Sequence, residues 1–223
     1  MSYCVAVDGP AGAGKSTIAR KVAGKLQLVY VDTGAMYRAM ALFMIRENVA
    51  KDALQTINEK CEEADITLKY ENGEQVVCLN GENVNAYLRT EEVGNMASVV
   101  ATQKAVRSRI VKTQKELAKT TDVIMDGRDI GTCVLPDADV KIFLTASSSV
   151  RAKRRFDELT AKGEKCDIAA IEKDIIERDE RDMTRKESPL RQAEDAILVD
   201  TSSMTIEEVV TEIIKICEEK KRG

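Results

Sequence analysis

The residues from Gly9 to Ser16 have the composition and spacing of a phosphate-binding loop. They read Gly-Pro-Ala-Gly-Ala-Gly-Lys-Ser, which fits the pattern G-x-x-x-x-G-K-[ST], and they follow an apolar run that predicts a buried strand. Small residues let successive backbone N–H groups point into one concavity, and the next helix adds the positive end of its dipole. The expected triphosphate-binding residues are Gly9, Pro10, Ala11, Gly12, Ala13, Gly14, Lys15, Ser16 and Thr17.

Two side chains of this loop have the chemistry to act on phosphates directly. Lys15 can reach the β and γ phosphates, and the Ser16 hydroxyl can complete the coordination of a magnesium ion that keeps mostly water ligands. Asp32, which closes the second apolar run, is a candidate to hold one of those waters. The alternative is a tight glycine-rich turn that binds nothing, but such a turn requires neither the lysine nor the serine in register.

The composition indicates a globular protein with reduced thiols. Of the 223 residues, 43% are hydrophobic and 32% charged, and the formal net charge is −4. This acidic balance, with three phenylalanines and no tryptophan, argues against an extended nucleic-acid surface. The six cysteines form no C-x-x-C pair and histidine is absent, so zinc has few ligands and a cytoplasmic location is expected. No apolar run approaches the roughly 18 residues of a membrane span, so no membrane partner is expected.

The elements that must position the loop are those of an α/β protein. Five short apolar runs predict buried parallel strands at 4–7, 28–31, 123–125, 140–144 and 196–199. Helical patterns alternate with them, which predicts a three-layer α/β/α sandwich with a five-stranded parallel sheet. Such sheets bind ligands beyond the carboxyl ends of their strands. The polar residues expected at that edge are Asp8, Asp32, Asp126, Thr145 and Asp200.

The interval 37–121 is too long for one crossover and predicts a small antiparallel insert. Asn72-Gly73 and Asn80-Gly81 flank one strand-like run, which indicates two successive hairpins because type I′ turns favour Asn-Gly. Helices are expected at about 35–48, 54–64 and 91–119. No internal repeat or linker divides the chain, so a single domain with an insertion is expected.

Three further segments carry arginines and carboxylates suited to a second, phosphorylated substrate. They are VDTGAMYR at 31–38, DGRDIGT at 126–132 and ERDERDMTR at 177–185. In the last segment Arg178, Asp182 and Arg185 share one face of the expected helix, and taken alone that stripe is most simply a solvated salt-bridge ladder. Beside a phosphate loop, arginines from separate segments favour phosphoryl clamps, because guanidinium pairs with phosphate oxygens in a planar, bidentate manner.

The basic run RAKRR at 151–155 follows the fourth predicted strand. Alone it fits a solvated helix face. In this context we expect Arg151, Arg154 and Arg155 to contact the triphosphate, while the segment from 151 to about 165 closes over the donor as a lid and excludes water. Gly163 is expected next to a hinge.

Together these motifs resemble those of bacterial cytidylate kinases. GPAGAGKST, VDTGAMYR, DGRDIGT and ERDERDMTR have the order and spacing seen in that family, and the double-hairpin insert lies where the family carries a three-stranded insert. The resemblance runs from Val5 to near Asp200. It implies a single kinase domain over 1–223, with a core of 1–36, 86–150 and 168–223. A nucleoside-monophosphate-binding insert would occupy about 37–85, and the lid about 151–167.

The resemblance also implies the substrates and the residues that bind them. ATP would be the donor, with Mg²⁺, and CMP or dCMP the acceptor, in pyrimidine nucleotide metabolism. The residues that correspond to those reading cytosine are Ser98, Arg107 and Asp129. Those corresponding to the ribose contacts are Arg178 and Asp182. Those corresponding to the grip on the monophosphate are Thr33, Arg38, Arg128 and Arg185, and Tyr37 is included because it lies in the same motif as Arg38.

Two features of this correspondence bear on its assignments. Thr33 stands where the family often has serine, which keeps the hydroxyl and predicts no change of reaction. Ser98 and Arg107 are nine residues apart, so on an unbroken helix they would face opposite ways. Either the helix breaks between them or one assignment is wrong.

The expected reaction is in-line phosphoryl transfer, which requires positioning and neutralisation of charge rather than a general base. Lys15, Arg128 and Arg185 are the expected catalytic residues, and a monomer is expected. The alternatives are a regulatory GTPase, which would need an Asn-Lys-x-Asp motif that the sequence lacks, and an ATP-driven mechanical or transport subunit. Within the kinases, adenylate, thymidylate, UMP/CMP and shikimate kinases are the nearer alternatives.

Overall fold

The computed structural model describes residues 2–222 and contains two sheets. The larger is a five-stranded parallel sheet in the order β2-β6-β1-β7-β8. Its strands are β1 (Cys4–Asp8), β2 (Val29–Asp32), β6 (Val123–Gly127), β7 (Val140–Thr145) and β8 (Ile197–Asp200). The smaller, antiparallel sheet consists of β3 (Ile66–Glu71), β4 (Glu74–Leu79) and β5 (Glu82–Asn83). The predicted fold class is thereby confirmed, with its parallel sheet, flanking helices and antiparallel insert.

The chain divides into two compact units, each of which is described by itself. The first unit is formed by residues up to 2 together with 29–122, and the second by 3–28 together with 123–223. The division into core, insert and lid that we expect from the sequence stays a prediction.

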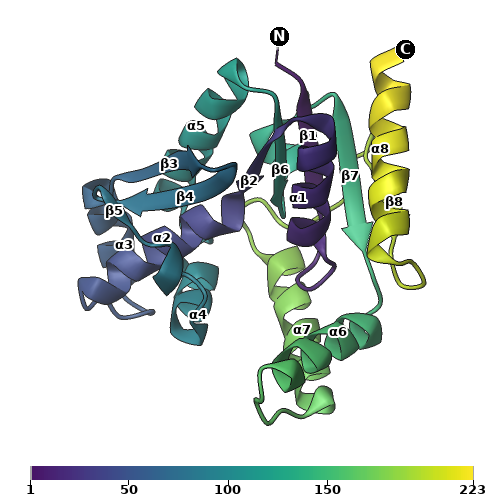
Figure 1. The fold of residues 1–223 in the computed structure, drawn as a ribbon. Coiled ribbons are helices and arrows are strands. Elements are labelled where there is room, and N and C mark those ends of the chain that lie inside the picture. Colours follow the sequence, from purple (N-terminus) through teal and green to yellow (C-terminus); the bar gives the residue numbers. More distant parts are fainter. Residues whose placement is uncertain (1, 223) are drawn as a thin grey trace. The chain divides into compact units, whose positions relative to one another are not determined.

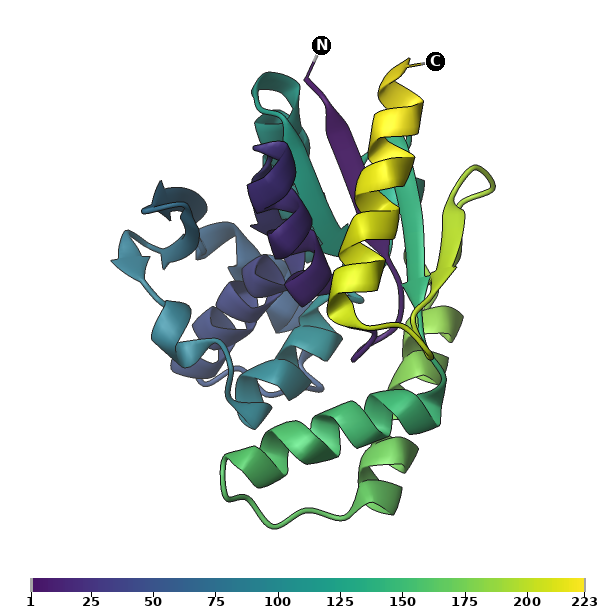
Figure 2. The same cartoon turned by 45° about the vertical axis from the view of Figure 1, so that its right-hand side comes forward.

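The second unit carries the phosphate loop at the carboxyl edge of its strands. Strand β1 pairs in parallel with β6 and β7, and its last residue, Asp8, lies in register with Gly127 and Phe143. Val5, Ala6 and Val7 of this strand are fully buried, as expected for a strand covered on both faces. Helices α1 (Lys15–Leu26) and α8 (Ile206–Arg222) pack against each other and run alongside the strands of this sheet (Figures 1 and 2). The loop between β1 and α1 therefore lies at the edge where parallel sheets bind ligands.

Two packed helices extend from the carboxyl end of β7 (Figure 2). They are α6 (Ser148–Ala161) and α7 (Ile168–Thr184). Ser147 caps the first through the N–H of Val150, and Asp167 caps the second through that of Ala169. Gly163, with φ of 79°, ends α6 in the left-handed conformation that glycine favours. The expected basic helix is present, and Gly163 lies in the turn that joins it to α7.

The first unit is built on helix α2 (Thr33–Arg46), which packs against β4 and against helix α4 (Glu91–Val100). Two further helices, α3 (Leu54–Lys60) and α5 (Lys104–Thr120), pack on each other. The core of this unit is apolar, with several fully buried methionines from α2 and α4. Both Asn-Gly turns have positive φ at both central residues, 53° and 80° in the first and 49° and 84° in the second. The two predicted hairpins are confirmed.

The helix expected over 91–119 is interrupted in the structure. Helix α4 ends at Val100 and α5 begins at Lys104, with three residues forming a turn between them. Among residues 2–222, no helix combines the length and apolar character needed to cross a bilayer.

Candidate functional site

The phosphate loop has the backbone conformation that its glycines predict. Gly9, Gly12 and Gly14 have φ values of 147°, 76° and 89°, all in a region that favours glycine. A Cβ on Gly9 would lie 1.9 Å from the carbonyl oxygen of Leu144 on the neighbouring strand β7. The loop therefore needs glycine at this position for space as well as for conformation.

Lys15 is held inside the loop as the first residue of α1. Its Nζ donates a hydrogen bond to the carbonyl oxygen of Pro10 at 2.7 Å, and the residue is only 6% exposed. Burial lowers the pKa of Lys15 well below its usual value, and the charge of Arg128 lowers it further, while Asp126 and Asp8 act in the opposite direction. Burial in the loop therefore disfavours the charged form of Lys15 when no anion lies beside it, and a phosphate oxygen would supply the missing negative partner.

Ser16 is paired with a carboxylate that the sequence interpretation did not assign to the site. Its Oγ donates a 2.8 Å hydrogen bond to Oδ2 of Asp126, a buried residue of β6. A hydroxyl beside a carboxylate is a set of hard oxygen donors that fits magnesium, which keeps several of its waters. The sequence did contain a signal for this contact, since Asp126 lies near the end of a predicted strand. That strand, β6, is the neighbour of β1 in the sheet, which brings Asp126 close to the phosphate loop.

Asp32, the residue expected near the metal, has other contacts in the first unit. It accepts a hydrogen bond from the backbone N–H of Ala35 and thereby caps α2. Its carboxylate also lies 3.2 Å from Nη2 of Arg89 and 3.8 Å from Nη1 of Arg38. Within the first unit, Asp32 thus organises the start of the helix that bears Thr33, Tyr37 and Arg38.

The Gly-Arg-Asp segment after β6 is tied to α7 and to the residues just beyond it by two ion pairs. Arg128 Nε lies 2.8 Å from Asp182 Oδ2, and Arg185 Nη2 lies 3.4 Å from Asp129 Oδ1. Burial would raise the pKa of Asp182, but the adjacent Arg128, with Arg178 and Arg185, holds it below its usual value. Four of the residues expected to bind the acceptor are therefore brought together within the second unit.

Arg185 caps the carboxyl end of the helix that bears Arg178 and Asp182, and its N–H donates to the carbonyl oxygen of Arg181 as in a helical turn. Helix α7 ends at Thr184, and Arg185 has an extended ψ of 141°. Its Nε donates to the carbonyl oxygen of Ser188 at 2.7 Å, and Pro189 follows, which lacks the N–H that helix continuation requires. The arginine therefore reaches Asp129 from the end of α7, where the chain leaves the helix.

The helix break in the first unit removes the conflict between Ser98 and Arg107. Ser98 lies on α4 and Arg107 on α5, so the two no longer share one helix. Arg107 is 6% exposed, its guanidinium lies 5.8 Å from the ring centroid of Tyr37, and Nη1 donates to the carbonyl oxygen of Ala101 at 3.4 Å. Ser98 Oγ donates to the carbonyl oxygen of Gly94 at 3.3 Å. Of the two residues of this unit expected to contact cytosine, Arg107 is the one that lies beside an aromatic ring, that of Tyr37.

The three arginines of the basic helix differ in their surroundings. Arg151 is buried, and its guanidinium contacts Ala146 O, Ala11 O and Asp179 Oδ2 at 2.8, 2.9 and 2.6 Å. Arg154 donates to the hydroxyl and carbonyl oxygens of Thr201, whereas the exposed Arg155 pairs with Glu158 one turn on. Arg151 thus supports the phosphate loop through this hydrogen bond to Ala11, which belongs to the loop.

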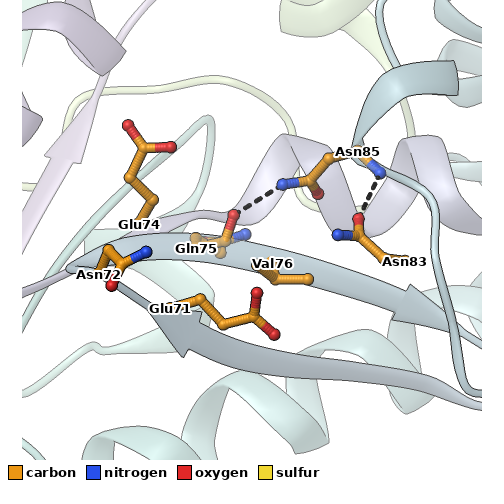
Figure 3. Close-up of a pocket in the computed structure, with 7 residues that line it drawn as sticks. All are labelled: Glu71, Asn72, Glu74, Gln75, Val76, Asn83 and Asn85. Atoms are coloured by element: carbon orange, nitrogen blue, oxygen red, sulfur yellow. Dashed lines mark hydrogen bonds between the residues drawn. The ribbon is translucent and has the colours of Figure 1, made fainter.

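A polar hollow of about 510 Å³ opens on the antiparallel sheet of the first unit (Figure 3). It is lined by Glu71, Asn72, Glu74, Gln75, Val76, Asn83 and Asn85. None of these is a residue that we expect to bind substrate. One of them, Gln75, donates through Nε2 to the carbonyl oxygen of Asp32 and accepts from its N–H, so β4 is fastened to the start of α2.

A phosphate loop of this form on a parallel sheet, with a buried lysine and paired arginines at the same edge, defines the class of P-loop phosphotransferases. A sequence model described as cytidylate kinase matches residues 5–219. The chain belongs to the cytidylate kinase family.

Relatives named cytidylate kinase match nearly the whole chain. The protein of that name from Caldicellulosiruptor saccharolyticus is 49% identical over 95% of this chain and 94% of its own length. The one from Listeria welshimeri is 48% identical over 97% of this chain and 96% of its own length.

Solved structures share the fold at low sequence identity. A gluconokinase from Sinorhizobium meliloti is 13% identical, with a TM-score of 0.50, over 97% of this chain and 92% of that one. An uncharacterized protein from Eubacterium ventriosum is 12% identical, with a TM-score of 0.51, over 97% and 99%. These likenesses concern the fold alone.

Proposed function

We propose that this protein transfers the γ-phosphoryl group of ATP to CMP and dCMP, giving ADP and CDP or dCDP. Membership of the cytidylate kinase family supports the choice of acceptor. The observation that carries the proposal is the register of β1 and β6. Asp8 lies beside Gly127, so the loop beginning at Gly9 and the segment beginning at Arg128 leave adjacent strands at the same edge.

The donor site consists of the phosphate loop with Lys15, Ser16 and Thr17. Backbone N–H groups of the loop hold phosphate oxygens, and Lys15 places its charge at the β and γ phosphates. Magnesium, held near Ser16 and Asp126, neutralises phosphate charge when bound. Arg154 and Arg155 are proposed donor contacts of a lid, and Arg151 contributes by supporting the loop through Ala11.

The proposed acceptor contacts are assigned in each unit separately. In the second unit Arg128 and Arg185 bind the monophosphate, Arg178 and Asp182 bind the ribose, and Asp129 reads the base. In the first unit Thr33, Tyr37 and Arg38 support the monophosphate, and Ser98 and Arg107 contact cytosine. The ion pairs of Arg128 with Asp182 and of Arg185 with Asp129 support this assignment, because they hold both arginines in defined orientations before substrate binds.

The reaction follows from these positions. An oxygen of the acceptor phosphate, already anionic, attacks the γ-phosphorus in line while the bond to the bridging oxygen breaks and ADP leaves. No side chain has to remove a proton from the nucleophile. Lys15, Arg128 and Arg185 stabilise the charge that spreads over the transferring phosphoryl oxygens, and closure of the lid excludes water that would otherwise hydrolyse ATP.

A panel of acceptors tests this proposal. ADP formation is measured with ATP, Mg²⁺ and one acceptor at a time from CMP, dCMP, UMP, dTMP, AMP, GMP and shikimate. We expect high kcat/KM with CMP and dCMP, a lower value with UMP and the lowest with the purines. A higher kcat/KM with AMP, dTMP or shikimate than with CMP would contradict the proposal. We further propose that the enzyme is cytoplasmic and acts as a monomer. Sedimentation of the purified protein tests the oligomeric state, and fractionation of cells tests the location.

A further inference from the structure

Asp8 joins the end of strand β1 to the segment that follows β6. Both oxygens of its carboxylate accept backbone hydrogen bonds, Oδ1 from the N–H of Ile130 at 2.8 Å and Oδ2 from the N–H of Gly131 at 2.7 Å. The residue is only 4% exposed. Asp8 immediately precedes Gly9, and the segment it holds immediately follows Arg128 and Asp129. One buried side chain therefore connects the proposed donor loop to the proposed acceptor residues.

The two N–H groups belong to the start of a short π-helical turn, Ile130–Val134, which Asp129 precedes. In an ordinary helix, the side chain of the preceding residue accepts a hydrogen bond from the second or third N–H of the helix. Asp129 has a side chain suited to this task, yet it makes no such bond. The second N–H of this turn is that of Gly131, and it already donates its hydrogen bond to Asp8.

The consequence is that Asp129 directs its carboxylate elsewhere. Its Oδ1 lies 3.4 Å from Nη2 of Arg185, and its backbone carbonyl accepts from the N–H groups of Cys133 and Val134. The other helix starts with a side-chain cap in residues 2–222 use a neighbour in sequence: Asp32, Thr90, Ser147, Asp167 and Thr205. At this turn the capping carboxylate comes instead from a strand more than a hundred residues earlier.

The turn is also confined on its other side. A Cβ on Gly131 would lie 3.1 Å from Cδ and 3.3 Å from Cγ of Lys141, and 3.4 Å from Oδ2 of Asp8. Lys141 is itself fixed, because its Nζ lies 2.8 Å from Asp195 Oδ2 and donates to the carbonyl oxygen of Pro136. The backbone of Gly131 thus lies between the stem of a buried lysine and the carboxylate of Asp8.

We infer that Asp8 is a positioning residue for base recognition: by capping the turn at 130–134 from strand β1, it prevents Asp129 from capping its own helix and keeps that carboxylate turned toward the acceptor. This inference rests on the proposed role of Asp129 in reading the base. The inference assigns separate functions to the two adjacent residues at the start of the phosphate loop. Asp8 contributes to the choice of acceptor, and Gly9 contributes to donor binding.

The test is Asp8→Asn, which keeps the shape of the side chain but offers one acceptor oxygen and an amide that cannot accept. The N–H of Gly131 then becomes available to Asp129. We expect the ratio of kcat/KM for CMP to that for UMP to fall about tenfold, mainly through a higher KM for CMP. The Kd of ATP, measured by titration calorimetry, is expected to stay within about twofold of the parent value.

Asp139→Asn is the matched control. Asp139 also accepts a backbone N–H bond of β1, from Cys4 at 2.7 Å, but at the opposite end of the strand and at an exposed position. It should leave the CMP to UMP ratio unchanged. A second comparison uses Asp129→Asn, alone and together with Asp8→Asn. If Asp8 acts through Asp129, adding Asp8→Asn to Asp129→Asn should lower the ratio no further.

The outcomes separate this inference from the proposed function. A parent protein inactive on CMP would overturn the proposed function, whereas an active parent whose CMP to UMP ratio is insensitive to Asp8→Asn would overturn this inference alone. An equal weakening of ATP and CMP binding would also overturn it, since that result makes Asp8 a general support of the loop. If Asp8→Asn does not fold, Gly131→Ala decides, because it keeps the carboxylate and displaces the same turn. A folded Gly131→Ala variant with the parent ratio contradicts the inference.

Discussion

Arg128 and Asp182 form a charge-assisted hydrogen bond, with Arg128 Nε 2.8 Å from Asp182 Oδ2, between the end of β6 and helix α7. Both side chains are about four-fifths buried, so the pair is poorly screened by solvent. A guanidinium fixed through Nε still has terminal N–H groups to offer a phosphate, although Nη1 also donates to the carbonyl oxygen of Gly127 at 3.4 Å. The pair thus connects the proposed ribose and monophosphate contacts.

Asp182→Asn should therefore weaken acceptor binding without weakening donor binding. We expect the Kd of CMP to rise by roughly tenfold to a hundredfold, because a charged hydrogen-bond partner is lost, while the Kd of ATP stays unchanged. Titration calorimetry with each nucleotide measures both. Asp174→Asn, at an exposed position of the same helix, is the control. Parallel losses of ATP and CMP affinity would mean that the pair is structural.

Lys15→Ala should abolish most phosphoryl transfer while leaving the fold intact. The lysine supplies the charge expected at the β and γ phosphates, and its removal should lower kcat by roughly a hundredfold or more. Its burial is unfavourable for the charged form, so thermal stability should not fall much. Lys25→Ala, at the exposed far end of α1, should keep the parent rate. A folded Lys15→Ala protein with parent activity would refute the loop assignment.

Asp126→Asn should raise the magnesium concentration that half-maximal activity requires. The carboxylate accepts from Ser16 Oγ at 2.8 Å, so its loss disturbs both the hydroxyl and the water shell of the ion. Magnesium titrations at saturating ATP and CMP compare this variant with Asp32→Asn. We expect a rise of about tenfold for Asp126→Asn and little change for Asp32→Asn. The reverse order would return the metal-binding role to Asp32.

Arg107→Met should reduce discrimination between cytosine and uracil. In the proposed base recognition, Asp129 accepts from the cytosine amino group and Arg107 donates to the ring, whereas uracil would place acceptor against acceptor and donor against donor. Unpaired polar groups cost about 1 to 3 kcal/mol each, so the parent should prefer CMP by roughly tenfold to several hundredfold. The kcat/KM ratio should collapse in Arg107→Met and persist in Arg109→Met, whose arginine pairs with Glu62. A ratio unchanged in both variants would exclude Arg107 from the base pocket.

Asp8 should make stability depend on pH between about 4 and 6. The pKa of Asp8 is raised to about 6 from 3.8. Burial is the main cause and the charge of Asp129 acts in the same direction, while the N–H groups of Gly131 and Ile130 and the charge of Lys15 oppose the rise. In this window the native state binds a proton that the unfolded state does not, so the contribution of Asp8 to stability falls as pH rises. The difference between these pKa values corresponds to roughly 3 kcal/mol.

Urea unfolding of the parent and of Asp8→Asn at about pH 4.5 and 7.5 measures this effect. The parent should lose stability relative to the variant as the pH is raised between these values. A difference between parent and Asp8→Asn that is constant with pH would mean that Asp8 does not titrate in this range.

Local patterns were sufficient to predict much of the fold. The five strands, the phosphate loop and both hairpins were predicted from short stretches, because in each of them the residue types favour the local backbone conformation. The positive φ values of Gly12, Asn72 and Gly73 are examples. The sequence did not decide whether the helix breaks between Ser98 and Arg107, because residues 101–103 contain neither glycine nor proline to signal the break. Helix α7 ends at Thr184, one residue before the end of the expected helical segment 177–185, because periodicity alone does not mark a helix end to the residue.

The sequence by itself determined which chemical groups are present and where the phosphate loop lies, because the spacing of Gly9, Gly14 and Lys15 acts within one strand–loop–helix unit. Only the tertiary structure decided the partners: Ser16 with Asp126, Arg128 with Asp182, and Asp8 with the turn at 130–134. The physical reason is that β1 pairs in parallel with β6, a strand more than a hundred residues later. Such a pairing requires a long crossover connection. A local sequence pattern therefore cannot predict which carboxylate will lie beside which hydrogen-bond donor in the folded sheet.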